Sequence, residues 1–357
     1  MTIQYTRMII FDNVAIMRSQ FRRKALLYND LGNSSIQCNT CWHKCVIKEG
    51  KHGRCKTRIN INGTLHTENY GMISTMSINP IEKKPLFHYY PGSYAFTIGS
   101  VSCNFSCPWC QNWSISKVYP FEVHIPRYLS PEDLVKKTES DPKIDGISIS
   151  FNEPTLLLEY ALDTFHLCKP ETYRMFVTNG YMTPRALELL FQAGMTGMSV
   201  TVKGNSDIAK KYCGINVEKV WDNIATAFKK GIHVEVICLI IPTVNDSLAF
   251  FREVGERVKE INPNIPLHFT RFYPDYQFTD VDPTPVAVLE DAHRVAHSIG
   301  INYVYLGNVF GHPLENTYCS NCRTLLIRRT GYKIEKHFDV QTCRCISCNS
   351  KIPLQLN

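Results

Sequence analysis

Three cysteines spaced C-x3-C-x2-C stand in the stretch Gly99-Ser-Val-Ser-Cys103-Asn-Phe-Ser-Cys107-Pro-Trp-Cys110-Gln-Asn-Trp113. Thiolates this close in sequence can bind one soft metal centre. A [4Fe–4S] cluster is normally held by four thiolates, so three would leave one iron without a protein ligand. Catalytic metal sites keep such an open position, whereas structural sites close their shell. The spacing indicates an open iron–sulfur cluster, with a structural zinc ion that takes a fourth ligand from elsewhere as the alternative.

The composition fits a large globular protein of the cytosol. The chain has 357 residues, of which 44% are hydrophobic, enough for a sizeable core. It has no run of eighteen apolar residues that would span a membrane, and residues 1–23 lack the uninterrupted apolar region of a signal peptide. The net charge of +7 comes without a long basic block, which favours a solvated surface over a nucleic-acid-binding face.

The fifteen cysteines are clustered: four lie in 38–55, three in 103–110 and five in 319–348. In a cytosolic chain, clustered C-x2-C spacings indicate metal ligands rather than disulfides. The isolated Cys168, Cys213 and Cys238 are expected to be buried small side chains.

We expect four segments along the chain. Residues 1–37 form a leader with a helix over 18–30, and residues 38–91 form a cysteine knuckle with a hairpin that turns at Asn62-Gly63. A loop rich in prolines, 79–92, leads to the large unit over 92–312, and residues 313–357 form a C-terminal module. In the knuckle, Cys38, Cys41, Cys45 and Cys55 can close a tetrahedral zinc shell. An auxiliary iron–sulfur cluster is the alternative, because no rule on cysteine spacing separates the two kinds of site.

Residues 92–312 alternate between short β-branched runs and helical stretches, which indicates βα units and a parallel sheet. Helices are expected from an N-cap at Ser130, from an N-cap at Thr183, and over 217–230 and 248–261. The expected strands are 94–98, 146–151, 173–177, 197–202, 233–241, 267–271 and 302–306. In parallel barrels, functional groups gather at the C-terminal ends of the strands.

Polar groups follow these strands at the expected positions. Asn152-Glu153-Pro154 follows one strand, and the Glu153 carboxylate can accept a hydrogen bond from an ammonium group. Thr178-Asn179 and Lys203 follow the next two, and plain turns are the alternative. The residues that follow the later strands are candidates for substrate contact, with a surface salt bridge as the alternative for the first three: His268, Arg271, Asp275, Asn308 and His312.

The C-terminal module has the pattern of a zinc ribbon. Cys319-x2-Cys322 and Cys345-x2-Cys348 flank a hairpin over 325–334. A fifth thiol, Cys343, leaves the ligand assignment open. We expect the module to cover one end of the large unit.

The cysteine triplet resembles the radical S-adenosylmethionine (SAM) signature C-x3-C-x-Φ-C, in which Φ is aromatic or apolar and is Trp109 here. Other stretches resemble the radical SAM enzymes of the so-called AmmeMemoRadiSam system, which are similar to pyruvate formate-lyase activating enzymes. These stretches lie between about residues 38 and 348: Cys38 to Cys55, Asn79 to Leu86, Cys107 to Trp113, Phe151 to Thr155, His268 to Tyr276, Gly307 to Val309 and Glu315 to Cys319.

The resemblance implies an α/β fold with a partial (β/α)6 TIM-like barrel, a [4Fe–4S] cluster on Cys103, Cys107 and Cys110, and bound SAM. In the family, the open iron chelates SAM, and one electron cleaves SAM to a 5′-deoxyadenosyl radical that abstracts hydrogen from a substrate. The residues that the resemblance places around SAM are Trp109, Asn152, Glu153, Pro154, Thr178, Asn179, Lys203 and Pro242. Asn152 replaces a glycine of the family turn, and Thr201 replaces an aspartate.

The resemblance also implies partners: an electron donor of the flavodoxin or ferredoxin type, and Memo-like and AMMECR-type proteins. The substrate, a small molecule or a protein side chain, stays open. Two alternatives remain, a glycyl-radical-enzyme activase and a non-catalytic zinc and iron–sulfur module that binds nucleic acid or a protein.

Overall fold

The computed structural model describes residues 19–122 and 127–356. About half of the expected leader, residues 1–18, lies outside the described residues. The helix expected over 18–30 is wrong from Arg23 on, where the chain forms β1 (Arg23–Lys24) and β2 (Tyr28–Asp30). β1 pairs with β6 (Thr64–Thr67), far along the chain, and β2 pairs with the neighbouring β3 (Ser35–Cys38), so strand pairing overrides the local helical pattern.

Two small antiparallel sheets form the N-terminal part, with strand orders β1-β6-β5 and β2-β3-β4. Their remaining strands are β4 (Val46–Lys48) and β5 (Arg58–Ile61). The hairpin between β5 and β6 is confirmed. Asn62 and Gly63 have φ of 51° and 73°, and a type I′ turn requires positive φ at both central positions.

A large sheet lies at the centre, and its eight described strands have the order β16-β15-β14-β13-β12-β11-β9-β8. The strands from β9 to β16 run parallel, and β8 pairs antiparallel with β9. The α/β fold class is confirmed, with seven parallel strands in this described sheet in place of six. The strand bounds lie within two residues of the expected ones: β9 (Tyr94–Gly99), β11 (Gly146–Ile149), β12 (Tyr173–Thr178), β13 (Gly197–Val202), β14 (His233–Ile240), β15 (Leu267–Arg271) and β16 (Val304–Gly307).

The expected loop over 79–92 is wrong in its first residues. β8 (Thr75–Pro80) ends there, and a 3-10 helix follows over Ile81–Lys83. Pro80 is tolerated because it is the last residue of an edge strand, where a missing N–H costs little. A two-stranded ladder, β7 (Met72–Ile73) with β10 (Arg127–Tyr128), lies nearby in the chain.

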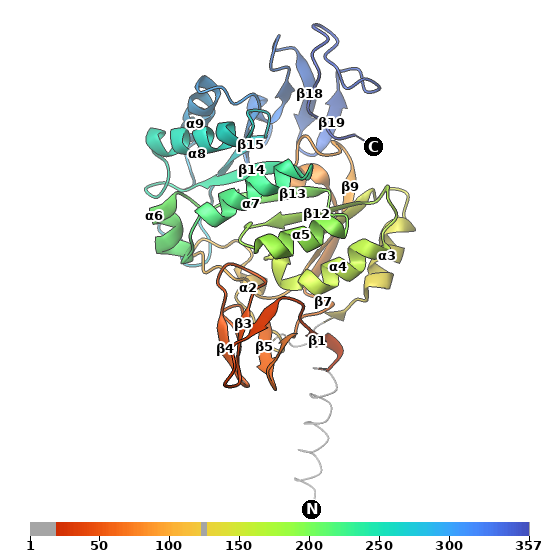
Figure 1. Ribbon diagram of the computed structural model, residues 1–357. Coiled ribbons are helices and arrows are strands. Elements are labelled where there is room, and N and C mark those ends of the chain that lie inside the picture. The colour runs from red at the N-terminus through yellow and green to blue at the C-terminus, as the bar shows by residue number, and fades with distance from the viewer. Residues whose placement is uncertain (1–18, 123–126, 357) are drawn as a thin grey trace, which may run out of the picture.

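Helices cover one face of the central sheet, as α4, α5 and α7 show in Figure 1. Their starts follow the expected capping. Ser130 Oγ accepts from Asp133 N at 3.0 Å, and Thr183 Oγ1 accepts from Ala186 N at 3.3 Å. The helices that lie wholly within the described residues are α2 (Trp113–Ser116), α3 (Pro131–Glu139), α4 (Leu158–Leu167), α5 (Pro184–Gln192), α6 (Ser206–Ile208), α7 (Glu218–Lys229), α8 (Leu248–Ile261) and α9 (Val286–Ser298), with 3-10 turns over Pro154–Leu157 and Pro313–Glu315 and a π-helix over Ala209–Cys213.

The two faces of the sheet differ in polarity, as β15 illustrates. Leu267 and Phe269 belong to the large apolar core with the helices. His268 and Thr270, which alternate with them, line a cavity. The face away from the helices is thus the one that can bind a polar ligand.

The C-terminal module lies at the end of the molecule opposite to β3, β4 and β5 (Figure 1). It consists of β17 (Thr317–Tyr318), β18 (Leu325–Thr330) and β19 (Lys333–Lys336), with the expected hairpin between β18 and β19. Arg329 of β18 is buried and donates to the carbonyl oxygen of Phe87 at 2.8 Å, of Glu315 at 3.0 Å, and to Thr317 Oγ1 at 2.8 Å. Within the described residues, no helix has both the length and the apolar composition to cross a membrane.

Candidate active site

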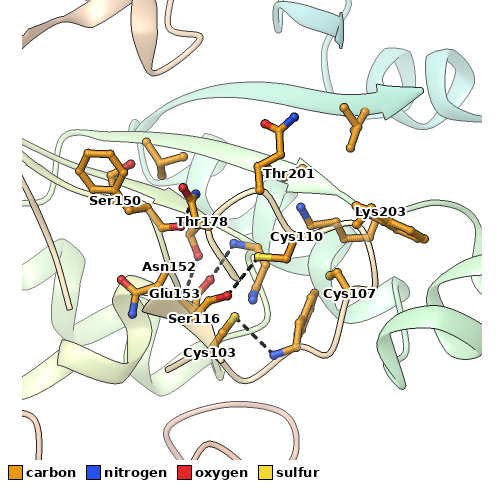
Figure 2. Close-up of a pocket in the computed structure, with 18 of the residues that line it drawn as sticks. Cys103, Cys107, Cys110, Ser116, Ser150, Asn152, Glu153, Thr178, Thr201 and Lys203 are labelled. Atoms are coloured by element: carbon orange, nitrogen blue, oxygen red, sulfur yellow. Dashed lines mark hydrogen bonds between the residues drawn. The ribbon is translucent and has the colours of Figure 1, made fainter. Parts of the chain in front are cut away.

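A cavity of about 420 Å³ opens where β9, β11, β12 and β13 end, and Cys103, Cys107 and Cys110 all line it. Figure 2 shows these cysteines on one loop, facing the same space as Glu153, Thr178 and Lys203. This is the edge at which ligands bind in parallel α/β folds. The structure therefore brings the triplet together with the strand-end residues.

Asn152 holds the start of the cysteine loop in place. Its Nδ2 donates to the carbonyl oxygens of Ser102 at 2.7 Å and Val101 at 3.2 Å, and its Oδ1 accepts from Ser100 N at 3.1 Å. Ser102 has a φ of 69°, and its Oγ donates to the carbonyl oxygen of Cys55 at 2.5 Å. The asparagine that departs from the family turn thus fixes the loop that carries the cysteines.

Each sulfur of the triplet has a hydrogen-bonding neighbour. Phe105 N donates to Cys103 Sγ at 3.4 Å, and Ser116 Oγ lies 3.0 Å from Cys110 Sγ. Cys213 Sγ lies 3.2 Å from Cys107 Sγ. Hydrogen bonds to ligand sulfurs tune an iron–sulfur cluster, so these three contacts belong to the site.

Cys213 is buried, as expected, but it also contacts Cys107, which the sequence did not indicate. Its S–H donates to the Cys107 sulfur and, with Lys203 and Lys117 nearby, lowers the pKa of Cys107 to about 6. Burial raises the pKa of Cys103 to about 12, so this thiol stays protonated until a metal displaces the proton.

The three cysteines suit a cluster better than a single zinc ion. In one tetrahedral ion with a metal–sulfur distance of about 2.3 Å, the sulfurs would lie about 3.8 Å apart. Among the described residues, the set with all sulfurs within 4.8 Å is a different one, at the C-terminal end of the chain. A cubane binds each thiolate to a separate iron, so its thiolates stand further apart. Three soft donors around a roomy, polar cavity fit a [4Fe–4S] cluster.

Glu153 is buried and already accepts four hydrogen bonds. Thr155 N, Thr155 Oγ1 and Thr178 Oγ1 donate to its Oε1 at 3.0, 2.5 and 2.7 Å, and Asn179 N donates to its Oε2 at 2.8 Å. Burial raises the pKa of this carboxyl group against these bonds. Glu153 thus joins the ends of two strands and keeps acceptor capacity on Oε2 for a ligand.

Lys84 lines the cavity. The sequence alone did not decide whether the loop before β9, which contains Lys84, lines the site or only connects two elements. It is 3% exposed, and its Nζ lies 5.1 Å from the centroid of the Phe151 ring. Burial, and then the charge of Lys83, lowers the pKa of Lys84 to about 7. The cavity has a third lysine in Lys203.

A second cavity, of about 450 Å³, adjoins the first, since Lys83 and Gln111 line both. It lies between the ends of β15 and β16 and the C-terminal module, and its lining includes His268, Asn308 and Tyr332. The two cavities together provide space for two ligands side by side.

The predicted site residues divide between these cavities and other places. Trp109, Asn152, Glu153, Thr178, Asn179, Thr201 and Lys203 line the first, and His268 and Asn308 line the second. Pro154, Pro242, Arg271, Asp275 and His312 are not among the described lining residues. Arg271 Nε donates to the carbonyl oxygen of Thr284 at 2.7 Å, Asp275 Oδ1 accepts from Trp113 Nε1 at 3.1 Å, and His312 Nε2 lies 3.2 Å from Glu290 Oε1.

At the C-terminal end, the sulfurs of Cys319, Cys322, Cys345 and Cys348 lie within 4.8 Å of one another. The sulfurs of Cys319 and Cys348 are 3.6 Å apart, as are those of Cys322 and Cys345. Cys343 stands outside this set, and its Sγ donates to the carbonyl oxygen of Ile352 at 3.5 Å. The spacing fits one tetrahedral ion.

At the N-terminal end, the expected ligands Cys38, Cys41, Cys45 and Cys55 line one small cavity of about 10 Å³. This is room for about one water-sized body. Asn104 lines the same cavity, and its Oδ1 accepts from Asn179 Nδ2 at 2.8 Å. The N-terminal cysteines therefore adjoin the candidate active site.

Comparison with known proteins agrees with this geometry. The family model described as Radical SAM superfamily matches residues 97–252. Uncharacterized protein MJ0808 of Methanocaldococcus jannaschii is 40% identical over 337 residues, which cover 94% of this chain and 100% of that protein. Uncharacterized protein MJ0674 of the same organism is 27% identical over 189 residues, 51% of this chain and 49% of that one.

A solved structure, that of a radical SAM methyltransferase from Sphaerobacter thermophilus, is similar at a TM-score of 0.47 and 15% identity. The likeness covers 61% of this chain and 67% of that one. At this level it says nothing about the reaction.

Proposed function

This chain belongs to the radical SAM superfamily, and from that premise we propose that Cys103, Cys107 and Cys110 hold a [4Fe–4S] cluster beside SAM in the first cavity. The observation that carries the proposal is the convergence of the three thiols with polar strand ends on one cavity. When bound, the cluster and SAM supply one-electron cleavage of SAM to a 5′-deoxyadenosyl radical, which abstracts hydrogen from a substrate.

The chain's own residues bind and orient these groups. Phe105 N, Cys213 and Ser116 donate hydrogen bonds to the three ligand sulfurs, and Asn152 holds the loop. We assign the SAM ammonium group to the free acceptor capacity of Glu153, and the SAM carboxylate to the lysines of the cavity, Lys84 and Lys203.

For the outer sites we propose zinc. Four thiols within 4.8 Å of one another at the C-terminal end support a closed, structural shell. At the N-terminal end the proposal rests on the four cysteines that share one small cavity, although their sulfurs are not gathered to the same distance. We also propose an electron donor of the flavodoxin or ferredoxin type, and Memo-like and AMMECR-type proteins as partners, on the resemblance of the sequence motifs alone. Comparing the yield of 5′-deoxyadenosine with and without each protein tests these partners.

The central experiment is SAM cleavage. The cluster is reconstituted anaerobically and reduced, SAM is added, and 5′-deoxyadenosine is measured by chromatography. We expect product from the wild type and from Cys168→Ala, a thiol on the C-cap of α4, and none from Cys107→Ala. Absence of product from the wild type under several reductants would remove the enzyme and leave a non-catalytic metal protein.

A further inference from the structure

The second cavity contains two buried polar atoms that have no hydrogen-bond partner in the described part of the chain, Glu82 Oε2 and His268 Nδ1. Glu82 is 5% exposed and His268 is fully buried. Buried polar atoms are nearly always hydrogen-bonded, so two orphans on the wall of one cavity indicate a missing ligand.

The other polar atoms of both side chains already have partners, so Glu82 Oε2 and His268 Nδ1 are the atoms left for a ligand. Gly92 N donates to Glu82 Oε1 at 2.8 Å, so Oε2 is the free oxygen. His268 Nε2 lies 2.6 Å from Glu235 Oε2. A carboxylate only accepts, so we assign the proton to Nε2, and in that tautomer Nδ1 offers a lone pair.

Glu235 is held as a carboxylate. It is fully buried and also accepts from Phe87 N at 3.0 Å, His88 N at 2.7 Å and His233 Nε2 at 3.0 Å. Burial acts to raise the pKa of Glu235, but hydrogen bonds from His233 and His268 outweigh it and hold the pKa well below its usual range. The orientation of His268 is therefore set by a fixed anion.

The charges around the cavity are unbalanced toward the acidic side. The wall contains one buried carboxylate, Glu82, and behind it lie a second one, Glu235, and one buried guanidinium, Arg329. The lining adds Glu315 and Lys83, whose opposite charges cancel. Burial raises the pKa of Glu82, and a cationic ligand beside it would favour its ionised form. With both buried carboxylates ionised, such a ligand would neutralise the one negative charge left over.

The rest of the wall is aromatic, formed by Phe87, Tyr273, Phe310 and Tyr332. Aromatic faces attract cations and bury apolar chains. A carboxylate, a ring nitrogen and several aromatic rings together suit an amine with an apolar body.

We propose that the second cavity binds a primary amine as the substrate, with the ammonium group donating hydrogen bonds to Glu82 Oε2 and His268 Nδ1. The amine is either a free small molecule or the end of a lysine side chain. Calling it the substrate rests on the proposed function, because only the cysteine cavity next to it, which shares Lys83 and Gln111, would supply the radical.

The test is binding of n-butylamine to the cluster-loaded protein at neutral pH, by calorimetry and by soaking of crystals. Butyrate and butanol are the negative and neutral probes of equal length, and Nα-acetyl-lysine amide is the side-chain probe. We expect butylamine to bind in this cavity, its nitrogen within hydrogen-bond distance of Glu82 and His268, and butyrate not to bind. If butylamine binds and Nα-acetyl-lysine amide does not, the substrate is a free amine. If Nα-acetyl-lysine amide binds, the substrate is a protein side chain.

The matched variants are Glu82→Gln and Glu335→Gln, which remove the same charge. Glutamine at 82 keeps an oxygen for Gly92 N, and Glu335 lies on exposed β19 away from the cavity. We expect Glu82→Gln to weaken the binding of butylamine about tenfold or more, and Glu335→Gln to leave this binding unchanged. Equal effects of the two variants, preference for butyrate, or an empty cavity in butylamine-soaked wild-type crystals would overturn the proposal.

The outcome is separate from that of SAM cleavage, since amine binding requires neither SAM nor a reduced cluster. A protein that binds butylamine but yields no 5′-deoxyadenosine keeps the amine site and loses the proposed enzyme. A protein that cleaves SAM but does not bind butylamine keeps the proposed enzyme and loses the amine site.

Discussion

Cys213 is the residue through which a distant part of the chain acts on the cysteine triplet. It ends the π-helix after β13, and its thiol donates to the Cys107 sulfur over 3.2 Å. A donor to a ligand sulfur stabilises the more negative, reduced cluster and so raises its reduction potential.

We therefore expect Cys213→Ala to lower the midpoint potential of the cluster. A hydrogen bond worth about 1 kcal/mol corresponds to about 40 mV for one electron. Redox titration followed by electron paramagnetic resonance measures the shift. Cys238→Ala, which removes a buried thiol of β14, is the control, and equal potentials in both variants would contradict the assigned role.

Lys84 gives the molecule a pH dependence of stability. Its pKa, lowered by burial to about 7, lies below that of an unfolded lysine, about 10.4. Between these values the unfolded chain binds more protons than the folded one, so this residue makes the free energy of unfolding rise with pH. Below pH 7 Lys84 is protonated in both the folded and the unfolded state, so its burial lowers the free energy of unfolding by its full amount.

Replacing Lys84 by Met should abolish this part of the rise, which is at most about 1.4 kcal/mol per pH unit. Anaerobic urea unfolding at pH 7 and pH 9 measures it. Lys336→Met, which replaces an exposed lysine of β19, should keep the wild-type slope. If Lys84→Met keeps it too, the lysine is not desolvated in the folded protein.

At the scale of elements, β18 and β19 depend on the metal site that flanks them. The hairpin packs on a small cluster that includes the ligands Cys319 and Cys345, too small a core to fold alone.

We expect Cys345→Ser to lose the C-terminal metal ion and to lower the melting temperature, because the remaining thiols cannot close the shell. Cys343→Ser should keep the metal, since Cys343 lies outside the ligand set. Elemental analysis and thermal unfolding of both variants measure this. Loss of the ion from Cys343→Ser instead would show that the ligand set is a different one.

Sequence patterns predict elements well where burial decides them. The parallel strands are β-branched runs buried on both faces, and their bounds were predicted within two residues. β1 and β8 were missed because their partner strands lie further along the chain, and β2 was missed because its pairing with the neighbouring β3 overrides a local helical pattern. In the site, the residues that follow strands were found by the barrel rule, whereas Lys84, Ser116 and Cys213 reach it only through the fold.

At the scale of the whole molecule, three cysteine sites lie along the structure, with the triplet between the two outer ones. Asn104 lines the N-terminal cysteine cavity and bonds to Asn179 of the active-site cavity. The sequence predicted the three groups from clustering, but not their adjacency.

The metal content of the whole chain follows from the three sites. We expect about four iron and about two zinc atoms per reconstituted chain. Cys41→Ala should remove one zinc and leave the iron unchanged, measured by inductively coupled plasma mass spectrometry, with Cys168→Ala as the control. About eight iron atoms in the wild type, falling to four in Cys41→Ala, would place a second cluster at the N-terminal site instead.

The guanidinium of Arg329 makes the C-terminal module inseparable from the barrel. One of its hydrogen bonds ends on the carbonyl oxygen of Phe87 in the segment before β9, so a chain cut after residue 312 would leave that carbonyl without this donor. Such a cut would also remove Gly331 and Tyr332 from the wall of the second cavity, so the module is part of that cavity as well as a cap on the sheet.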